Sequence, residues 1–295
     1  MAHQKHRRAV ARDEGQWVGL FDERCEPIMD CPPLLPPMSA PASRNTPSSF
    51  RGLFSVRGED GQVHDIVGEL ASGGGVVDAQ GQWVRVPQRS RFIVVERAGG
   101  QRYTYRVSHV VDSGDWETST SMEVHGADLL AELNRHVAWS GPTTVTGNFT
   151  TFTRDWAGPE NVGVQFTKPR DLQDFKMVTV ADGATLGGGE GDTAESTIRE
   201  LIERSLGTSW RASGIPGVVE DPPIVVDPAG SGLPSPRVLI RPADDRLLDT
   251  VVPDAEAAGV KITARLWLPG DPVVPGLVLA GPKIVVRVEQ MAEVA

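Results

Sequence analysis

The pattern of apolar and polar positions along the chain indicates a mainly β protein. Residues 91–98 are apolar and rich in β-branched side chains, Gly99 and Gly100 follow, and a second strand-like run covers residues 101–111. Two such runs around two glycines predict a β-hairpin with a two-residue turn, because glycine adopts positive φ freely. Neighbouring strands are predicted by shorter runs at 17–21, 83–86, 116–124, 237–240, 260–268 and 283–289.

Elsewhere the apolar period changes from two to about 3.6, which predicts helices. Leu129, Leu130 and Leu133 fall on one face of a short helix over residues 128–133. Further helices are expected over residues 170–178 and 247–258, the second with a break at Pro253.

The strongest helix signal follows the glycine-rich residues 187–191, which are interpreted as a hinge. Asp192 can cap the helix, and Glu195 lies three residues further on, as in a capping box. Gly207 suits the C-terminal cap, because glycine tolerates the left-handed conformation that ends many helices.

These elements divide the chain into three parts. Residues 1–15 are polar and are expected to form a flexible N-terminal arm, since termini are usually loosely held. Residues 16–140 are expected to be a β-rich domain that ends in the short helix, and residues 141–295 an α+β portion with two main helices and C-terminal strands. Repeated prolines predict an extended connector over 31–49, and prolines with glycines predict a long loop over 214–236.

The charge of the chain disfavours a nucleic-acid-binding domain. There are 39 acidic and 29 basic side chains, which gives a formal net charge of −10, and no domain-wide basic footprint is present. The one basic cluster contains Lys5, Arg7, Arg8 and Arg12. Two interpretations stay open for it: an arm that binds an acidic neighbour, or a solvated tail.

Two cysteines, Cys25 and Cys31, are too few for a disulfide framework and match no common zinc spacing. We expect both to be free thiols in a protein assembled in a reducing cytoplasm. Apolar runs long enough to span a membrane are absent from the sequence.

A search for catalytic motifs favours a protein that is not an enzyme. The metalloprotease, P-loop and nucleophile-elbow patterns are absent from the sequence. Glu123 and His125 lie two residues apart in a predicted strand and therefore share a face, but a third partner is not evident. We expect no catalytic residue, no cofactor and no metal site.

The order of elements, together with four short stretches, resembles a known family. Residues 121–135 run from a strand through Gly126-Ala127-Asp128-Leu129-Leu130 into a helix, and the stretches that match the family further along are 197–202, 264–271 and 283–288. They resemble the tail-tip hub or minor tail proteins of long-tailed phages that infect actinobacteria, a family similar to the baseplate hub of contractile tails. The resemblance implies an antiparallel β-barrel-like tube domain with a smaller α/β portion.

The same resemblance implies a structural role in the virion. The chain would be a tail-tip subunit assembled in the bacterial host cytoplasm, in a ring that is a homotrimer and continues the tail tube. Its partners would be the distal tail protein, the tape measure protein and other tip or fibre proteins, with DNA only passing through the lumen and no membrane contact. The alternatives are a distal tail protein ring, a tail-associated cell-wall hydrolase and a carbohydrate-binding module.

The predicted hairpin over 91–111 is apolar on both faces. Its length and apolar content exceed what one small domain is expected to bury. We therefore expect it to pack against a neighbouring subunit in the ring. Val94 and Tyr105 from the hairpin, with Leu130 and Leu133 from the short helix, are the candidate interface residues.

Overall fold

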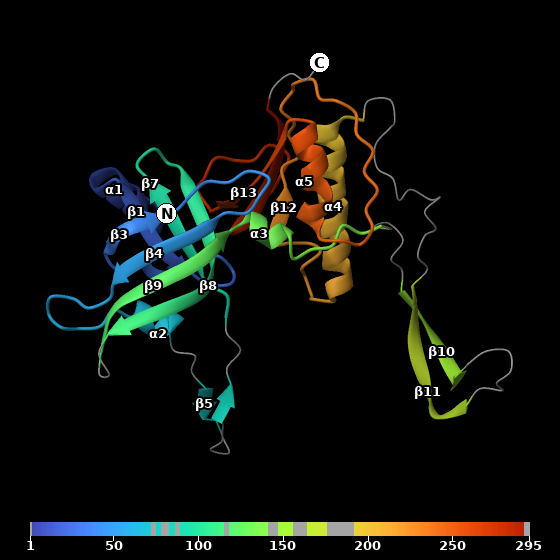
Figure 1. The fold of residues 1–295 in the computed structure, drawn as a ribbon, viewed down its shortest axis with the longest axis horizontal. Helices are drawn as coiled ribbons and strands as arrows, with labels where there is room; N and C mark the ends of the chain where they lie inside the picture. Colours follow the sequence, from blue (N-terminus) through green and yellow to red (C-terminus); the bar gives the residue numbers. More distant parts are fainter. Residues whose placement is uncertain are drawn as a thin grey trace.

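The structure is a computed structural model that describes residues 2–71, 75–77, 83–85, 89–114, 118–140, 147–155, 164–175 and 192–291. Within these residues the protein is mainly β, as the sequence predicts. A curled seven-stranded antiparallel sheet lies beside a layer of three strands and two longer helices (Figure 1). None of the described helices is long and apolar enough to cross a membrane.

The seven-stranded sheet is built around the predicted hairpin. The two strands of that hairpin pair up to Arg97 opposite Gln101, so three residues, 98–100, connect them where two were predicted. Gly100 has φ +76°, a conformation that glycine favours. Along the sheet the strands are β2 (Pro27–Asp30), β1 (Gln16–Phe21), β7 (Phe92–Arg97), β8 (Arg102–Gly114), β9 (Ser119–Asp128), β4 (Ser49–Ser55) and β3 (Leu34–Ser39).

One face of the curled sheet encloses a core of its own. Alternate residues of the central strands, among them Phe54, Ile93, Tyr105 and Met122, are buried there. The short helix α2 (Ile66–Leu70) contributes Ile66 to the same core. More and less buried side chains alternate along β4 and β9, whereas β7 is buried on both faces.

The opposite face of the sheet packs against the second layer. That layer is a three-stranded sheet with two helices, and its elements are β12 (Ile224–Val226), β14 (Lys283–Gln290), β13 (Val260–Trp267), α4 (Ala194–Ser213) and α5 (Leu247–Ala257). Strand β14 pairs parallel with β12 and antiparallel with β13. A single core joins Trp17, Phe92 and Val94 of the curled sheet to α4 and α5. The two portions that the sequence separates at residue 140 therefore share one hydrophobic core.

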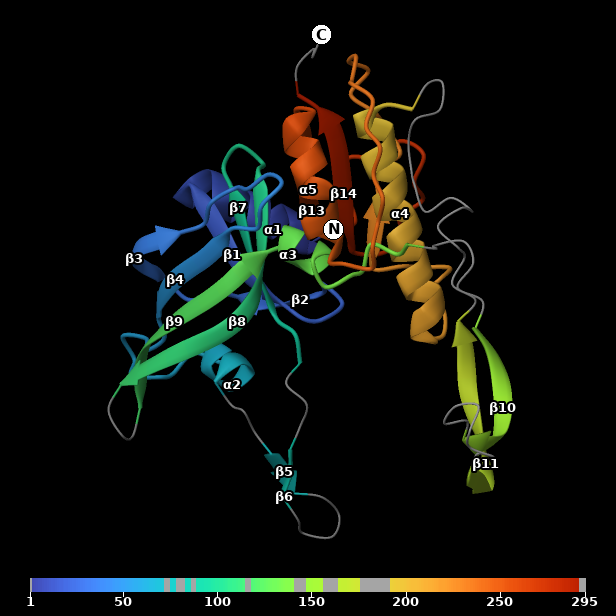
Figure 2. The ribbon, with the colours of Figure 1, turned by 45° about the vertical axis from the view of Figure 1, so that its right-hand side comes forward.

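The prediction of a flexible arm over residues 1–15 was wrong. Residues Ala2–Glu14 form helix α1, which lies against the curled sheet (Figure 2). Ala11 is buried in the shared core, and Arg7 is 2% exposed with its guanidinium between carboxylates. The basic N-terminal cluster, whose charges the sequence suggests are exposed to solvent, is therefore partly neutralised by carboxylates inside the fold.

Several boundaries in the C-terminal portion also differ from the predictions. Residues 170–175 of the helix expected over 170–178 instead form the end of β11 (Val164–Phe175), which pairs with β10 (Gly147–Asp155). Residues 176–178 and the hinge at 187–191 lie outside the described residues. Thr193, not Asp192, caps α4 through a capping box with Ser196. Helix α4 continues through Gly207 to a left-handed Gly214, α5 includes Pro253 without a break, and residues 237–240 form no strand.

Two hairpins extend away from the body of the molecule in both ribbon views (Figures 1 and 2). One is the long pair β10 and β11, and the other is the short pair β5 (Gly75–Val77) and β6 (Trp83–Arg85). The strand predicted at 83–86 is thus confirmed, but it pairs with β5 and not with the hairpin of β7 and β8.

Candidate functional site: an arginine-lined cleft between the two layers

A cleft of about 650 Å³ opens where helix α1, the turn between β7 and β8, and the end of β13 meet. Five arginines and two carboxylates line it, together with a small apolar wall. The lining residues that carry the argument are Arg8, Arg12, Arg97, Arg102, Arg265, Glu96, Asp271, Leu266, Trp267 and Pro272. A cleft of this size is in the range of ligand-binding sites in proteins.

Four charged side chains form an ion-pair network at the base of the cleft. Arg102 donates hydrogen bonds from Nε (3.2 Å) and Nη2 (3.0 Å) to Oε2 of Glu96, and its Nη1 and Nη2 donate to both carboxylate oxygens of Asp271. Arg7 Nε lies 2.9 Å from the same Glu96 oxygen, and Arg7 Nη2 lies 3.6 Å from Asp271. Two cations and two anions therefore balance one another in a site that is largely closed to water.

The electrostatics of this network are those of mutually stabilised charges. Burial opposes ionisation of Asp271, but hydrogen bonds from Arg102 and from the Leu268 N–H hold the pKa of Asp271 below its ordinary value. Burial likewise opposes the charge of Arg102, and the carboxylates of Asp271 and Glu96 raise the pKa of Arg102. For Arg7, burial and the like charge of Arg102 lower the pKa.

The rim of the cleft is positive because its own carboxylates are already paired. Among the described residues, neither Arg8 nor Arg265 has an ion pair, and both are exposed. Arg97 is also exposed, but its guanidinium is engaged: it lies 4.9 Å from the centre of the Tyr103 ring and donates to the Ala40 carbonyl at 3.4 Å. Arg12 is paired with the adjacent Asp13.

This arrangement favours binding over acid–base chemistry. A carboxyl group that acts as a general acid near neutral pH needs a raised pKa, whereas the pKa of Asp271 is lowered. The Glu96 carboxylate is ion-paired to both Arg7 and Arg102. The groups that remain available in the cleft are guanidinium donors, which bind anions.

The four predicted interface residues lie elsewhere, and all are inside the protein. Val94, Tyr105, Leu130 and Leu133 are each at most 2% exposed. Tyr105 belongs to the core of the curled sheet, where its hydroxyl donates to the Pro41 carbonyl at 2.7 Å, and the other three belong to the core shared by the two layers. They contact the chain's own residues and are not accessible to a neighbouring subunit, so their assignment to an interface was wrong.

Glu123 and His125 lie on one face of β9, as their spacing predicts. Their side chains are 2.7 Å apart, Arg51 of β4 donates two hydrogen bonds to Glu123, and His125 stacks on His109 of β8 with ring centres 4.3 Å apart. A search of the described residues finds no group of three or more His, Cys, Asp or Glu side chains that could hold a metal ion.

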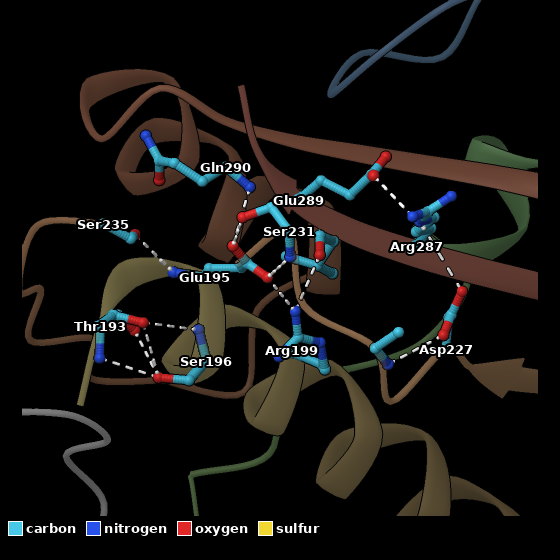
Figure 3. Close-up of polar contacts among 12 residues, drawn as sticks. Thr193, Glu195, Ser196, Arg199, Asp227, Ser231, Ser235, Arg287, Glu289 and Gln290 are labelled. Atoms are coloured by element: carbon cyan, nitrogen blue, oxygen red, sulfur yellow. Dashed lines mark hydrogen bonds and ion pairs between the residues drawn. The ribbon is translucent and has the colours of Figure 1, made fainter. Parts of the chain in front are cut away.

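A second buried carboxylate, Glu195, joins three segments of the second layer (Figure 3). It accepts hydrogen bonds from the Ser231 N–H at 2.7 Å, the Gln290 N–H at 3.1 Å and Arg199 at 2.5 Å. Burial opposes its charge, but these donors hold the pKa of Glu195 below its ordinary value. Glu195 thus links the start of α4 to the loop after β12 and to the end of β14, a structural role.

The cleft could not be found from the sequence, because its residues come from distant segments. The only signal is the basic cluster near the N-terminus, of which Arg7 contributes to the buried network and Arg8 and Arg12 to the rim. The residues that complete the cleft follow about 90 and 260 positions later, from Glu96 onward and from Arg265 onward.

The fold and the cleft together define a mainly β protein whose two layers meet at an arginine-lined site. No protein-family model matches the sequence, and no curated protein is significantly similar to it.

Proposed function

We propose that this chain is a structural subunit of a phage tail tip, a hub or minor tail protein that joins the tail tube to distal tip or fibre proteins. The resemblance of four sequence stretches to that family is the first support. The curled antiparallel sheet is compatible with a tube-forming domain, in which several copies would complete a ring wall.

The observation that carries the proposal is a part of β8 whose outer edge pairs with no other strand among the described residues. Strand β8 pairs with β7 only as far as Arg106, and Val107 makes the last backbone hydrogen bond on that side, to the Arg91 carbonyl. From Ser108 to Gly114, β8 pairs with β9 alone among the described strands. Open backbone donors and acceptors along a strand recruit a further strand, which is how sheets extend between subunits.

The side chains on this edge are suited to contact with a neighbour. Val111 is 48% exposed, and it is one of the large apolar side chains left at the surface. The projecting hairpin of β10 and β11 is a second feature suited to contact with a neighbouring subunit. An isolated two-stranded hairpin is at best marginally stable in water, so a partner surface would stabilise it.

The test is a substitution at the open edge in the phage that encodes the chain. Val111→Lys places a charge where another strand would pair, a change that natural edge strands use to prevent pairing. Infectious particles should fall at least about tenfold, and electron micrographs should reveal tails without complete tips. Val63→Lys is the matched control, since Val63 is 36% exposed but does not lie in a named strand, and it should leave the titre unchanged.

Purified virions provide a direct check of the same proposal. The chain should be present in tails detected with a specific antibody, and labelling should be confined to the tip. Its absence from purified virions, or a normal titre for Val111→Lys, contradicts the proposed function.

A further inference from the structure

The arginine-lined cleft carries more positive charge than its own acids neutralise. Glu96 and Asp271 are both committed to Arg7 and Arg102. Among the lining arginines, Arg8 and Arg265 have no carboxylate paired to them within the described residues, whereas the Arg97 guanidinium lies over the Tyr103 ring and donates to the Ala40 carbonyl. This excess is local, since the whole chain has a formal charge of −10.

We propose that this cleft binds an oligophosphate, meaning a compact ligand with several linked phosphate groups, free or as an ester. The two lining arginines without an ion pair, Arg8 and Arg265, come from different elements, α1 and β13, and so belong to two sides of the cleft. A tetrahedral phosphate has oxygens on several sides and accepts from such a set of donors. A planar carboxylate has two oxygens and suits one guanidinium, as Asp271 does with Arg102.

The ion pairs among Arg7, Arg102 and the two carboxylates at the base of the cleft are already formed without a ligand. Arg7 is 2% exposed, and its Nε and Nη2 lie near carboxylates without making well-directed hydrogen bonds. Burial and neighbouring positive charge oppose the charge on Arg7. An anion in the cleft relieves this repulsion, so ligand binding should stabilise the folded protein.

The walls fix the size and character of the ligand. Leu266, Trp267 and Pro272 form an apolar wall beside the arginines, which leaves room for an organic group on a phosphate ester. The volume of about 650 Å³ accommodates a small molecule and not an extended polymer. This inference does not depend on the tail-tip proposal.

Isothermal titration calorimetry on the full chain at constant ionic strength tests it, with sodium tripolyphosphate as the probe. Tripolyphosphate should bind at one site per chain, and citrate, a carboxylate anion of similar charge, at least about tenfold more weakly. Arg8→Ala and Arg265→Ala should each weaken tripolyphosphate binding about tenfold, the effect of one charge-assisted hydrogen bond. Both side chains are exposed, so thermal melting should find both variants folded.

Arg51→Ala is the matched control, because Arg51 is an exposed arginine on the sheet face formed by β4 and β9, outside the cleft. Its binding of tripolyphosphate should equal that of the unmodified protein. Adenosine triphosphate without metal distinguishes the two sources of the ligand: tighter binding than tripolyphosphate assigns a phosphate ester, and equal binding a free oligophosphate.

Four results would overturn the proposal. The first is no heat of binding with tripolyphosphate, and the second is equal affinity for citrate, which would make the site a general anion site. The third is unchanged affinity in both cleft variants, which would place the ligand elsewhere. A DNA duplex that binds more tightly than tripolyphosphate would also contradict it, because a duplex needs an extended surface.

Discussion

Replacing Asp271 by asparagine should destabilise the protein strongly, because it removes one of two anions from a buried network. The Asp271 side chain is 11% exposed, accepts hydrogen bonds from Arg102 and from the Leu268 N–H, and lies 3.6 Å from Arg7. Asparagine keeps the shape and one hydrogen-bond acceptor. It leaves Glu96 as the one carboxylate in the network opposite the guanidinium groups of Arg7 and Arg102. Removing one partner of a buried ion pair costs about 3–5 kcal/mol. Because asparagine keeps one acceptor, we expect a loss of about 3 kcal/mol.

Urea denaturation followed by tryptophan fluorescence measures this loss, since the chain has seven tryptophans. Asp30→Asn is the matched control: Asp30 is 45% exposed, pairs with His6 and accepts from the Trp17 indole. An exposed pair of this kind contributes up to about 1 kcal/mol. A difference between Asp271→Asn and the unmodified protein of less than about 1 kcal/mol would refute the reasoning.

The same variant has a defined pH dependence. The pKa of folded Asp271 is below the value of 3.8 for an unperturbed aspartate, so the folded state favours its ionised form. Its contribution is therefore complete above about pH 4 and is lost as the pH falls further towards the folded pKa. The gap in free energy of unfolding between the unmodified protein and Asp271→Asn should narrow below about pH 4. A gap that stays constant from pH 7 to pH 3 would contradict the assigned role.

Two further predictions concern side chains outside the cleft. Gly126→Ala should cost about 1–3 kcal/mol in urea denaturation, because its Cβ would lie 2.6 Å from the Arg106 carbonyl oxygen. Gly68→Ala, in helix α2 with open space around it, should be neutral or stabilising by up to about 1 kcal/mol, and equal losses in the two variants would refute this contrast. Burial, and then the nearby Asp22 charge, raise the pKa of Cys25 to about 12, so in a Cys31→Ser background this thiol should react with a disulfide reagent at pH 8 only after unfolding. Rapid reaction of the native protein would show that Cys25 is accessible.

The strands could be predicted from the sequence because their signals are local. The turn glycines and the apolar, β-branched run of β7 are local features, and the structure confirms the hairpin of β7 and β8, with a connection one residue longer than predicted. The helix prediction over 170–178 failed because a local signal is missing there. That stretch has no clear alternation, and its strand is defined by its pairing with β10, which a local pattern does not contain.

The interface residues were misassigned for a tertiary reason. A hairpin that is apolar on both faces does need two partners, and this part of the interpretation was sound. The curled sheet covers one face through its own core, and α3 (Leu130–Leu133), α4 and α5 cover the other, so the chain itself supplies both partners. Val94 and Tyr105 point to opposite cores for this reason.

The basic N-terminal cluster illustrates the limit of charge patterns. Arginines spaced along a polar segment suggest a solvated arm, and only the fold reveals that Glu96 and Asp271 lie opposite Arg7. The residues of the network are 89 to 264 positions from Arg7 in the chain, and they are brought together by the packing of α1 against both layers. A pattern of neighbouring residues cannot indicate a contact between residues so far apart in the chain.

Helix α1 and Arg102 join the two layers through hydrogen bonds and ion pairs. Gln4 donates a hydrogen bond at 2.6 Å to the Gly270 carbonyl, beyond β13, while Arg7 is paired to Glu96 at the end of β7. Arg102 of β8 donates to the Leu266 carbonyl at 3.0 Å as well as to Asp271. Hydrogen bonds and ion pairs are directional, whereas apolar contacts permit sliding, so this joint fixes the angle between the layers as well as their contact. If the chain has the proposed tail-tip function, this joint would hold the open strand edge at a set orientation, and an oligophosphate in the adjacent cleft would reinforce the joint from α1 and β13.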